Sequence, residues 1–257
     1  MNLRVLCGLS LFMFLCSTAQ AQEITVAAAA DLRPALEEIA SRFQAVSGTR
    51  VRLIYGSSGN FYQQIQNGAP FDMFFSANLD YPKKLESAGF IMPGTYYEYA
   101  RGKIVLMAPA RSTLDLKRGL RVLLDPAVKK IAIADPSHAP YGQAAVAALN
   151  AEKIYDQVSA RLVTGENISQ TASFVLSGAA DAGIVALSLA RSAGSQVRFM
   201  EIPASDYAPI KQACVVLRWS KEPERARQFQ SFIQSEEAAQ IFERSGFEVP
   251  PTAKPVH

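Results

Sequence analysis

The chain has 257 residues, of which 49% are hydrophobic and 19% are charged, and this composition is typical of a folded globular protein rather than a disordered one. Its 26 basic and 23 acidic residues are nearly balanced and scattered, without a run of five of one sign. The sequence therefore gives no support to nucleic-acid binding.

The first 21 residues have the three parts of a secretory signal peptide. Arg4 supplies the positive charge, residues 5–16 form a short apolar run, and residues 19–21 read Ala-Gln-Ala, a small-x-small cleavage pattern. We predict cleavage after Ala21 and export to the periplasm. The residues before Cys16 are not the small ones that a lipoprotein signal needs, so no lipid anchor is expected. No later stretch reaches the roughly 18 apolar residues of a membrane span, so the mature protein is not expected to insert into a membrane.

The mature chain alternates short apolar runs with segments of helical periodicity, which indicates an α/β fold with mostly parallel sheets. Strands are predicted at residues 24–28, 51–55, 71–77, 103–109, 131–135, 161–165, 182–187, 196–203 and 210–218. Helices are predicted at residues 32–46, 60–68, 81–89, 141–158, 167–178 and 223–247, the last with a break near Ser235. The proline-rich residues 250–257 are expected to be disordered.

Cys214 is the single cysteine left after removal of the signal peptide. It cannot form an intrachain disulfide, and it lies in an apolar run typical of a strand. We therefore predict a buried, inert thiol.

At four places a predicted strand ends in small residues just before a predicted helix: "VAAAADL", "YGSSGNF", "AIADPSHAPYG" and "VTGENIS". In parallel α/β sheets, ligands bind where such turns converge at the carboxyl ends of the strands. Small side chains let a ligand approach the backbone, and helix starts present free N–H groups that attract anions. The hydroxyls of Ser57 and Ser58 add further donors. The pattern predicts a site for a polar or anionic ligand.

Motifs for covalent catalysis are missing from the sequence. "GSSG" is not the G-x-S-x-G nucleophile elbow, and no H-E-x-x-H, C-x-x-C, P-loop or G-x-G-x-x-G pattern occurs. The tyrosines of "YYEYA" near residue 97 are unevenly spaced, so ordinary packing is expected of them rather than a ferric site. A periplasmic serine hydrolase using Ser58 and His138 is the remaining enzymatic alternative. We predict a protein that is not an enzyme and needs no cofactor.

Five segments resemble the periplasmic molybdate-binding proteins of ABC transporters: "AAAADL", "YGSSGNFYQQIQNGAPFDMFFSA", "IAIADPSHAPYGQAA", "GENISQTASFV" and "DAGIVALS". They occur in family order, from about residue 24 to residue 247. The resemblance implies a two-lobed type II periplasmic binding protein with a ligand cleft between α/β lobes. It places the first lobe at residues 22–104 and 213–249 and the second at residues 105–212, with chain crossings near 101–105 and 211–215. It further implies a monomer that captures molybdate, and also tungstate, for an ABC permease and its ATPase.

The same resemblance implies the residues that contact the oxyanion. They are Asp31 and Ser58 from the first lobe, with Tyr141, Ile168 and Ala186 from the second. All would touch the oxygen atoms of molybdate and none would bind the metal directly, and Tyr141 and Ile168 would contribute mainly backbone N–H groups. This chain departs from the family pattern twice, with Asp31 where many members have serine and Ala186 where some have tyrosine.

Asp31 poses an electrostatic problem, because a carboxylate about 4 Å from one negative charge is repelled by roughly 4 kcal/mol at an effective dielectric constant near 20. The favoured interpretation makes Asp31 an N-cap whose carboxylate accepts from the N–H of Arg33 or Ala35. A second interpretation protonates Asp31 beside the ligand. In a third the ligand carries the proton, which would make the protein a receptor for another tetrahedral oxyanion such as phosphate or arsenate.

Overall fold

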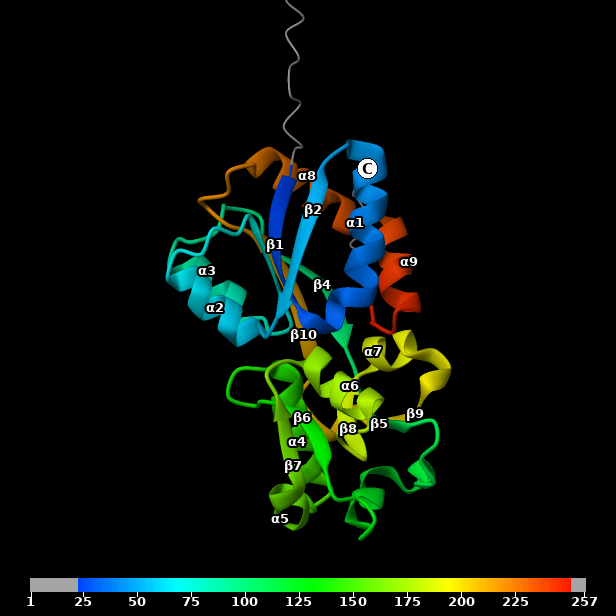
Figure 1. Ribbon diagram of the computed structural model, residues 1–257. Coiled ribbons are helices and arrows are strands. Elements are labelled where there is room, and N and C mark those ends of the chain that lie inside the picture. The colour runs from blue at the N-terminus through cyan, green and yellow to red at the C-terminus, as the bar shows by residue number, and fades with distance from the viewer. Residues whose placement is uncertain (1–22, 251–257) are drawn as a thin grey trace, which may run out of the picture.

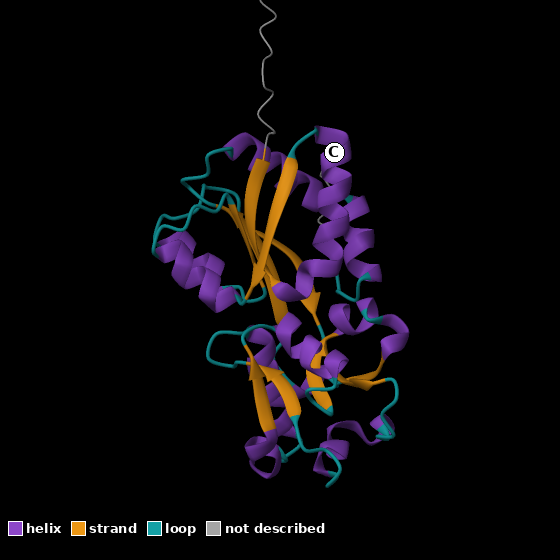
Figure 2. Ribbon diagram, viewed as in Figure 1, coloured by secondary structure: helices purple, strands orange, loops and turns teal. Residues whose placement is uncertain are grey.

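The computed structural model describes residues 23–250, so the predicted signal peptide and residues 251–257 of the predicted tail lie outside the described residues. The chain forms two lobes, each built on a five-stranded sheet with helices on its faces (Figures 1 and 2). This architecture confirms the predicted two-lobed α/β fold. The prediction of mostly parallel sheets is wrong, because in each sheet two strand pairings are parallel and two are antiparallel.

The first sheet has the order β2-β1-β3-β10-β4. Its strands are β1 (Glu23–Ala29), β2 (Arg50–Gly56), β3 (Met73–Ser76), β4 (Tyr97–Gly102) and β10 (Ile210–Val216). β1 pairs in parallel with β2 and β3, whereas β10 runs antiparallel to both β3 and β4. The sequence pattern does not predict β4: the tyrosine-rich segment, of which only ordinary packing is expected, forms the edge strand of this sheet.

The second sheet has the order β7-β6-β8-β5-β9. Its strands are β5 (Ile104–Pro109), β6 (Ile131–Ala134), β7 (Leu162–Gly165), β8 (Ala182–Ala186) and β9 (Val197–Glu201). The chain enters this sheet between β4 and β5 and leaves it between β9 and β10. Since β10 lies wholly in the first sheet, the predicted lobe boundary between residues 212 and 213 falls inside a strand.

The helices are α1 (Arg33–Ser47), α2 (Ser58–Gln66), α3 (Asp80–Ser87), α4 (Pro140–Ala151), α5 (Tyr155–Val158), α6 (Ile168–Ser177), α7 (Leu187–Ser192), α8 (Pro223–Ile233) and α9 (Glu236–Arg244). Gly48 ends α1 in a left-handed conformation. The predicted helix at 141–158 is wrong in its middle, because Lys153 has a φ of 56° and separates α4 from α5. The predicted break near Ser235 is confirmed: its hydroxyl accepts from the N–H of Ala238 and so begins α9.

Aromatic packing joins α8 and α9 to the first sheet. The ring of Phe229 on α8 lies 6.1 Å from that of Phe75 on β3, and Phe242 on α9 stacks on Tyr99 of β4 at 5.3 Å. Burying one such side chain stabilises the fold by roughly 1.5–3 kcal/mol. Cys214 on β10 is also fully buried in this lobe, as predicted, and burial raises the pKa of its thiol to about 12.

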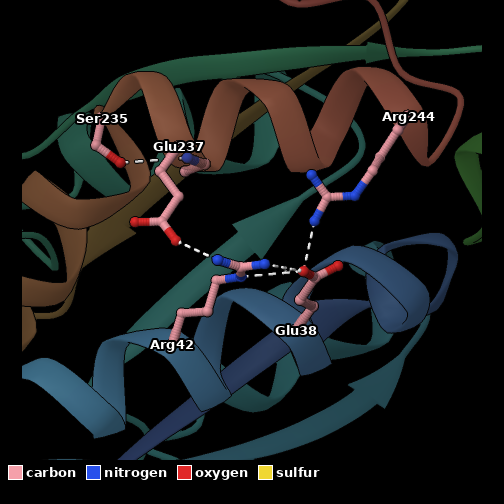
Figure 3. Close-up of polar contacts among 6 residues, drawn as sticks. Glu38, Arg42, Ser235, Glu237 and Arg244 are labelled. Carbon is pink, nitrogen blue, oxygen red and sulfur yellow. Dashed lines mark hydrogen bonds and ion pairs between the residues drawn. The ribbon is translucent and has the colours of Figure 1, made fainter.

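A surface ion-pair network also links α1 to α9 (Figure 3). Glu38 accepts hydrogen bonds from Arg42 and from Arg244, and Arg42 also contacts Glu237 at 2.7 Å. These side chains are partly exposed, so each pair contributes little. The network nevertheless joins α9 to α1, the last and the first α-helices among residues 23–250, and both belong to the first lobe.

Within residues 23–250, no helix combines the length and the hydrophobicity that a bilayer crossing requires. In the same part of the chain, no three His, Cys, Asp or Glu side chains are grouped so that they could hold a metal ion.

Candidate ligand-binding site

A small, tight hollow lies between the two lobes, with a cavity volume of about 10 Å³, which is room for about one water molecule. The first lobe contributes the carboxyl ends of β1, β2 and β3 and the segments that follow them. The second lobe contributes Ala139, the first two residues of α4 and the first residue of α6. The lining residues are Ala29, Ala30, Asp31, Gly56, Ser57, Ser58, Ala77, Ala139, Pro140, Tyr141 and Ile168.

The structure brings four of the five predicted contact residues to this hollow, namely Asp31, Ser58, Tyr141 and Ile168. The fifth, Ala186, does not line it. Ala186 is fully buried at the end of β8, where it pairs with Ile104 and precedes α7.

Three helices begin at the wall of the hollow, and one residue in the first turn of each lines it. Ser58, Tyr141 and Ile168 lie in the first turns of α2, α4 and α6, where N–H groups have no acceptor within the helix. None of these three N–H groups hydrogen-bonds to another residue between 23 and 250. The helix dipoles add positive potential at the same points, so the hollow suits an anion.

Local capping explains why the Ile168 N–H remains available. The Asn167 side chain is the N-cap of α6 and accepts from the N–H groups of Ser169 and Gln170. Neither of these hydrogen bonds uses the N–H of Ile168. On α2, the Ser58 hydroxyl accepts from the N–H of Ala77 at 2.9 Å. A hydroxyl that accepts in this way keeps its own hydrogen for donation to a ligand.

Asp31 does not cap its helix, so the favoured N-cap interpretation is wrong. Neither the 3₁₀ turn at Ala30–Leu32 nor α1 has a side-chain cap, and the Arg33 N–H instead donates to the carbonyl of Ala30. Asp31 lies within this turn rather than before it. Its carboxylate contacts β10 and the second lobe. Oδ2 accepts from Gln212 Nε2 on β10 at 2.6 Å and from the Tyr141 hydroxyl on α4 at 2.7 Å.

The Asp31 carboxyl group is fully buried, and burial raises its pKa from 3.8 to about 6. The two hydrogen bonds from Gln212 and Tyr141 act in the opposite direction because they favour the ionised form. The second carboxyl oxygen, Oδ1, is buried without a hydrogen-bond partner in the described part of the chain.

Two residues of this network were not predicted from the sequence. Gln212 of β10 donates to Asp31, and its Oε1 accepts from the Tyr99 hydroxyl of β4 at 2.8 Å. Both side chains are buried and lie on the two strands that adjoin the lobe crossings. The signal for Gln212 was present, since it is a polar residue inside an otherwise apolar strand, where burial requires hydrogen-bond partners.

Ser57 and His138 form a second contact between the lobes. His138 Nδ1 lies 2.8 Å from Ser57 Oγ, and Ser57 Oγ donates to the backbone carbonyl of His138 at 2.6 Å. Asp135 lies 3.6 Å from the other ring nitrogen. The three residue types resemble a hydrolase triad, but the serine is Ser57 and not the predicted Ser58. The Ser57 hydroxyl donates to the backbone carbonyl of His138, so its hydrogen is not directed at the imidazole as it would be in a triad.

Further bonds from the second lobe hold the segment that carries Asp31. The Ser169 hydroxyl donates to the Ala30 carbonyl at 3.0 Å, and the Ser188 hydroxyl donates to the Asp31 carbonyl at 2.7 Å. The lobes also meet at Gly59, whose N–H donates to the carbonyl of His138. A Cβ atom at Gly59 would lie 2.6 Å from that oxygen, so this closed approach requires glycine.

Comparisons with known proteins agree with this architecture. The chain is 36% identical over 242 residues to the molybdate-binding protein ModA of Rhodobacter capsulatus, covering 93% of this chain and 94% of that one. It is 35% identical to ModA of Azotobacter vinelandii, covering 91% and 92%. The solved periplasmic molybdate-binding protein of Azotobacter vinelandii superposes with a TM-score of 0.83 at 36% identity, covering 88% of this chain and 99% of that structure.

A more distant structure shares only the fold. The sulfate-binding protein SubI of Mycobacterium tuberculosis superposes with a TM-score of 0.74 at 17% identity, covering 90% of this chain and 88% of that structure. The family model described as bacterial extracellular solute-binding protein matches residues 24–248, nearly the whole described chain. The chain therefore belongs to the family of bacterial extracellular solute-binding proteins.

Proposed function

We propose that this protein is a periplasmic receptor that captures molybdate, and also tungstate, and delivers it to an ABC permease and its ATPase. The observation that carries the proposal is the convergence of three unengaged helix N–H groups, from both lobes, on one hollow. The names of the relatives that cover nearly the whole chain supply the identity of the anion.

The proposed contacts are neutral donors. The N–H groups of Ser58, Tyr141 and Ile168 and the Ser58 hydroxyl would surround the oxyanion, and its charge would be balanced by helix dipoles. No Lys or Arg side chain lines the hollow within the described residues. We retain Asp31 as a contact and Ala186 as a residue close to the site, following the family resemblance.

Ligand capture would follow from closure of the two lobes. α2 lies in the first lobe, and α4 and α6 lie in the second, so one anion completes its set of hydrogen bonds only when the lobes meet. A ligand that binds the closed form better shifts the population toward it. The function needs no catalytic residue and no cofactor, and a monomer suffices for it. Residues 1–21 would direct export and be removed after Ala21.

The test is a thermal-shift screen with molybdate, tungstate, sulfate, phosphate and arsenate, followed by calorimetry. Only a true ligand raises the melting temperature by binding the folded state. Molybdate and tungstate should each give a large shift and sulfate should give none. No shift with molybdate or tungstate between about pH 5 and pH 8 would refute the proposal. Ester hydrolysis that is lost in Ser57→Ala or Ser58→Ala would favour the hydrolase alternative instead.

The second candidate is a receptor for a protonated tetrahedral oxyanion such as hydrogenphosphate or hydrogenarsenate. One observation favours it: the buried Asp31 oxygen without a partner could accept a hydrogen bond from such a ligand. Molybdate is unprotonated near neutral pH and could not donate that hydrogen. A shift with phosphate or arsenate but not with molybdate would select this candidate.

A further inference from the structure

The unexplained feature of the hollow is a buried carboxyl group beside a site built for anions. Asp31 lines the hollow with no solvent exposure, and one of its two oxygens has no hydrogen-bond partner among residues 23–250. A carboxylate at this place would repel a bound oxyanion, and a buried site screens that repulsion poorly. A molybdate receptor therefore needs a way to remove the Asp31 charge.

The hydrogen bonds around Asp31 define where a proton can reside. The Tyr99 hydroxyl donates to Gln212 Oε1, which turns the Gln212 amide nitrogen toward Asp31. Oδ2 of Asp31 then accepts from Gln212 and from the Tyr141 hydroxyl, and Gln212 Nε2 also contacts the Tyr141 oxygen at 3.1 Å. Gln212 Nε2 can only donate, and the Tyr141 hydroxyl has no acceptor other than Oδ2 among residues 23–250, so Oδ2 acts as the acceptor of both bonds. A proton on the carboxyl group must therefore be on Oδ1, the oxygen without a partner.

The surroundings of Asp31 contain no cation that could stabilise its charge. Across the described chain, no Lys, Arg or His side chain pairs or hydrogen-bonds with Asp31. The nearest titratable groups are Tyr141 on α4 and Tyr99 on β4, followed by Tyr207 beside Tyr141 and Cys214 beside Tyr99. Burial raises the pKa of all four, so they are neutral near pH 7. His138 contacts Ser57, not Asp31.

We propose that Asp31 binds the oxyanion as a neutral carboxylic acid, with its proton on Oδ1 donated in a hydrogen bond to a ligand oxygen. This inference rests on the proposed function. Each molybdate is then bound together with one proton, which comes from solvent onto Oδ1 and returns to solvent when the ligand leaves. The raised pKa of the empty site, about 6, agrees with this role, and a bound dianion would raise it further.

The experiment compares the full mature protein with Asp31→Asn. The asparagine side chain matches the neutral acid, because its oxygen can accept from Gln212 and Tyr141 while its NH₂ group occupies the position of the Oδ1–H donor. Molybdate binding is measured by calorimetry from about pH 5 to pH 9, in pairs of buffers with different ionisation enthalpies, which gives the number of protons bound. Asp181→Asn is the matched control. Asp181 precedes β8 and accepts from the N–H groups of Lys129 and Lys130, at the end of that strand opposite the hollow.

The wild-type protein and Asp181→Asn should take up nearly one proton per molybdate near pH 8, and their Kd should weaken about tenfold per pH unit above the pKa of the free site. Asp31→Asn should take up none, show a flat Kd, and bind more tightly than the wild type near pH 8. Molybdate binding by the wild type without proton uptake would overturn the inference and leave the proposed function intact. Tight binding of phosphate or arsenate that Asp31→Asn abolishes would also overturn it, since the proton would then belong to the ligand. Failure of both proteins to bind molybdate at any pH would instead refute the proposed function.

Discussion

Replacing Asp31 with asparagine should change the pH dependence of stability even without a ligand. The pKa of this carboxyl group is 3.8 when hydrated and about 6 in the structure, because burial disfavours the charged form. Between these pH values the folded state keeps a proton that the unfolded state has released, so the free energy of unfolding falls as the pH rises. At about 1.4 kcal/mol per pKa unit, the loss reaches about 3 kcal/mol above pH 6 and is absent below pH 3.8.

The asparagine side chain carries no charge, so the Asp31→Asn variant avoids this loss. It should match the wild type near pH 3.5 and exceed it by about 3 kcal/mol near pH 8, where the wild-type carboxyl group is ionised. Urea unfolding followed by the fluorescence of Trp219, the single tryptophan of the chain, measures this difference, and circular dichroism tests whether the transition is two-state. Asp181→Asn should keep the wild-type profile. Parallel profiles for the wild type and Asp31→Asn would show that Asp31 is hydrated in the ligand-free protein and would refute the reasoning.

Three further predictions concern the network, the lobe contact and the surface. Gln212→Met removes the hydrogen bond that most lowers the pKa of Asp31. The pH above which molybdate affinity weakens should therefore rise by about one to two units. Calorimetry across the pH range measures this pH, and a lower value than in the wild type would contradict the prediction. Gly59→Ala should weaken molybdate binding at least about tenfold, a cost of about 1.4 kcal/mol or more, and should also lower the melting temperature of the ligand-free protein, because the added Cβ would lie 2.6 Å from the carbonyl oxygen of His138; unchanged affinity and melting temperature would exclude this contact between the lobes. Glu38→Gln should lower the melting temperature slightly at low salt, and the difference from the wild type should shrink near 0.5 M salt; a difference that salt does not affect would assign the loss to packing.

Much of the fold could be predicted from the sequence because its elements are locally specified. The apolar positions of α1 recur at helical spacing, and the helix ends at Gly48. Ser235 marks the junction between α8 and α9. Strand direction could not be predicted in this way. β5 and β10 have the same apolar pattern as the parallel strands, and only their long-range pairing makes them antiparallel. β4 was missed because Tyr99 packs against Phe75 and Phe242, and this long-range packing leaves no strand periodicity in the sequence.

The site, like the fold, combines features that could be predicted from the sequence with features that could not. The small residues and helix starts around Ser58, Tyr141 and Ile168 were visible in the sequence, because a turn between strand and helix is a local feature. The hydrogen-bond partners of Asp31 were not visible in the sequence. Gln212 is 181 residues away in the chain and Tyr141 is 110 residues away, so a local interpretation of Asp31 could offer only the nearby N–H groups of its own helix.

Local sequence is enough to specify α/β elements whose helix starts follow small residues, since capping, periodicity and turn chemistry act over a few residues. The meeting of Ser58 from one lobe with Tyr141 and Ile168 from the other at one hollow depends instead on how the lobes pack together. The environment of Asp31 depends on the same packing, because burial and hydrogen bonding involve groups that folding brings together from distant parts of the chain. The charge of this one side chain is therefore a property of the closed pair of lobes and not of the segment that contains it.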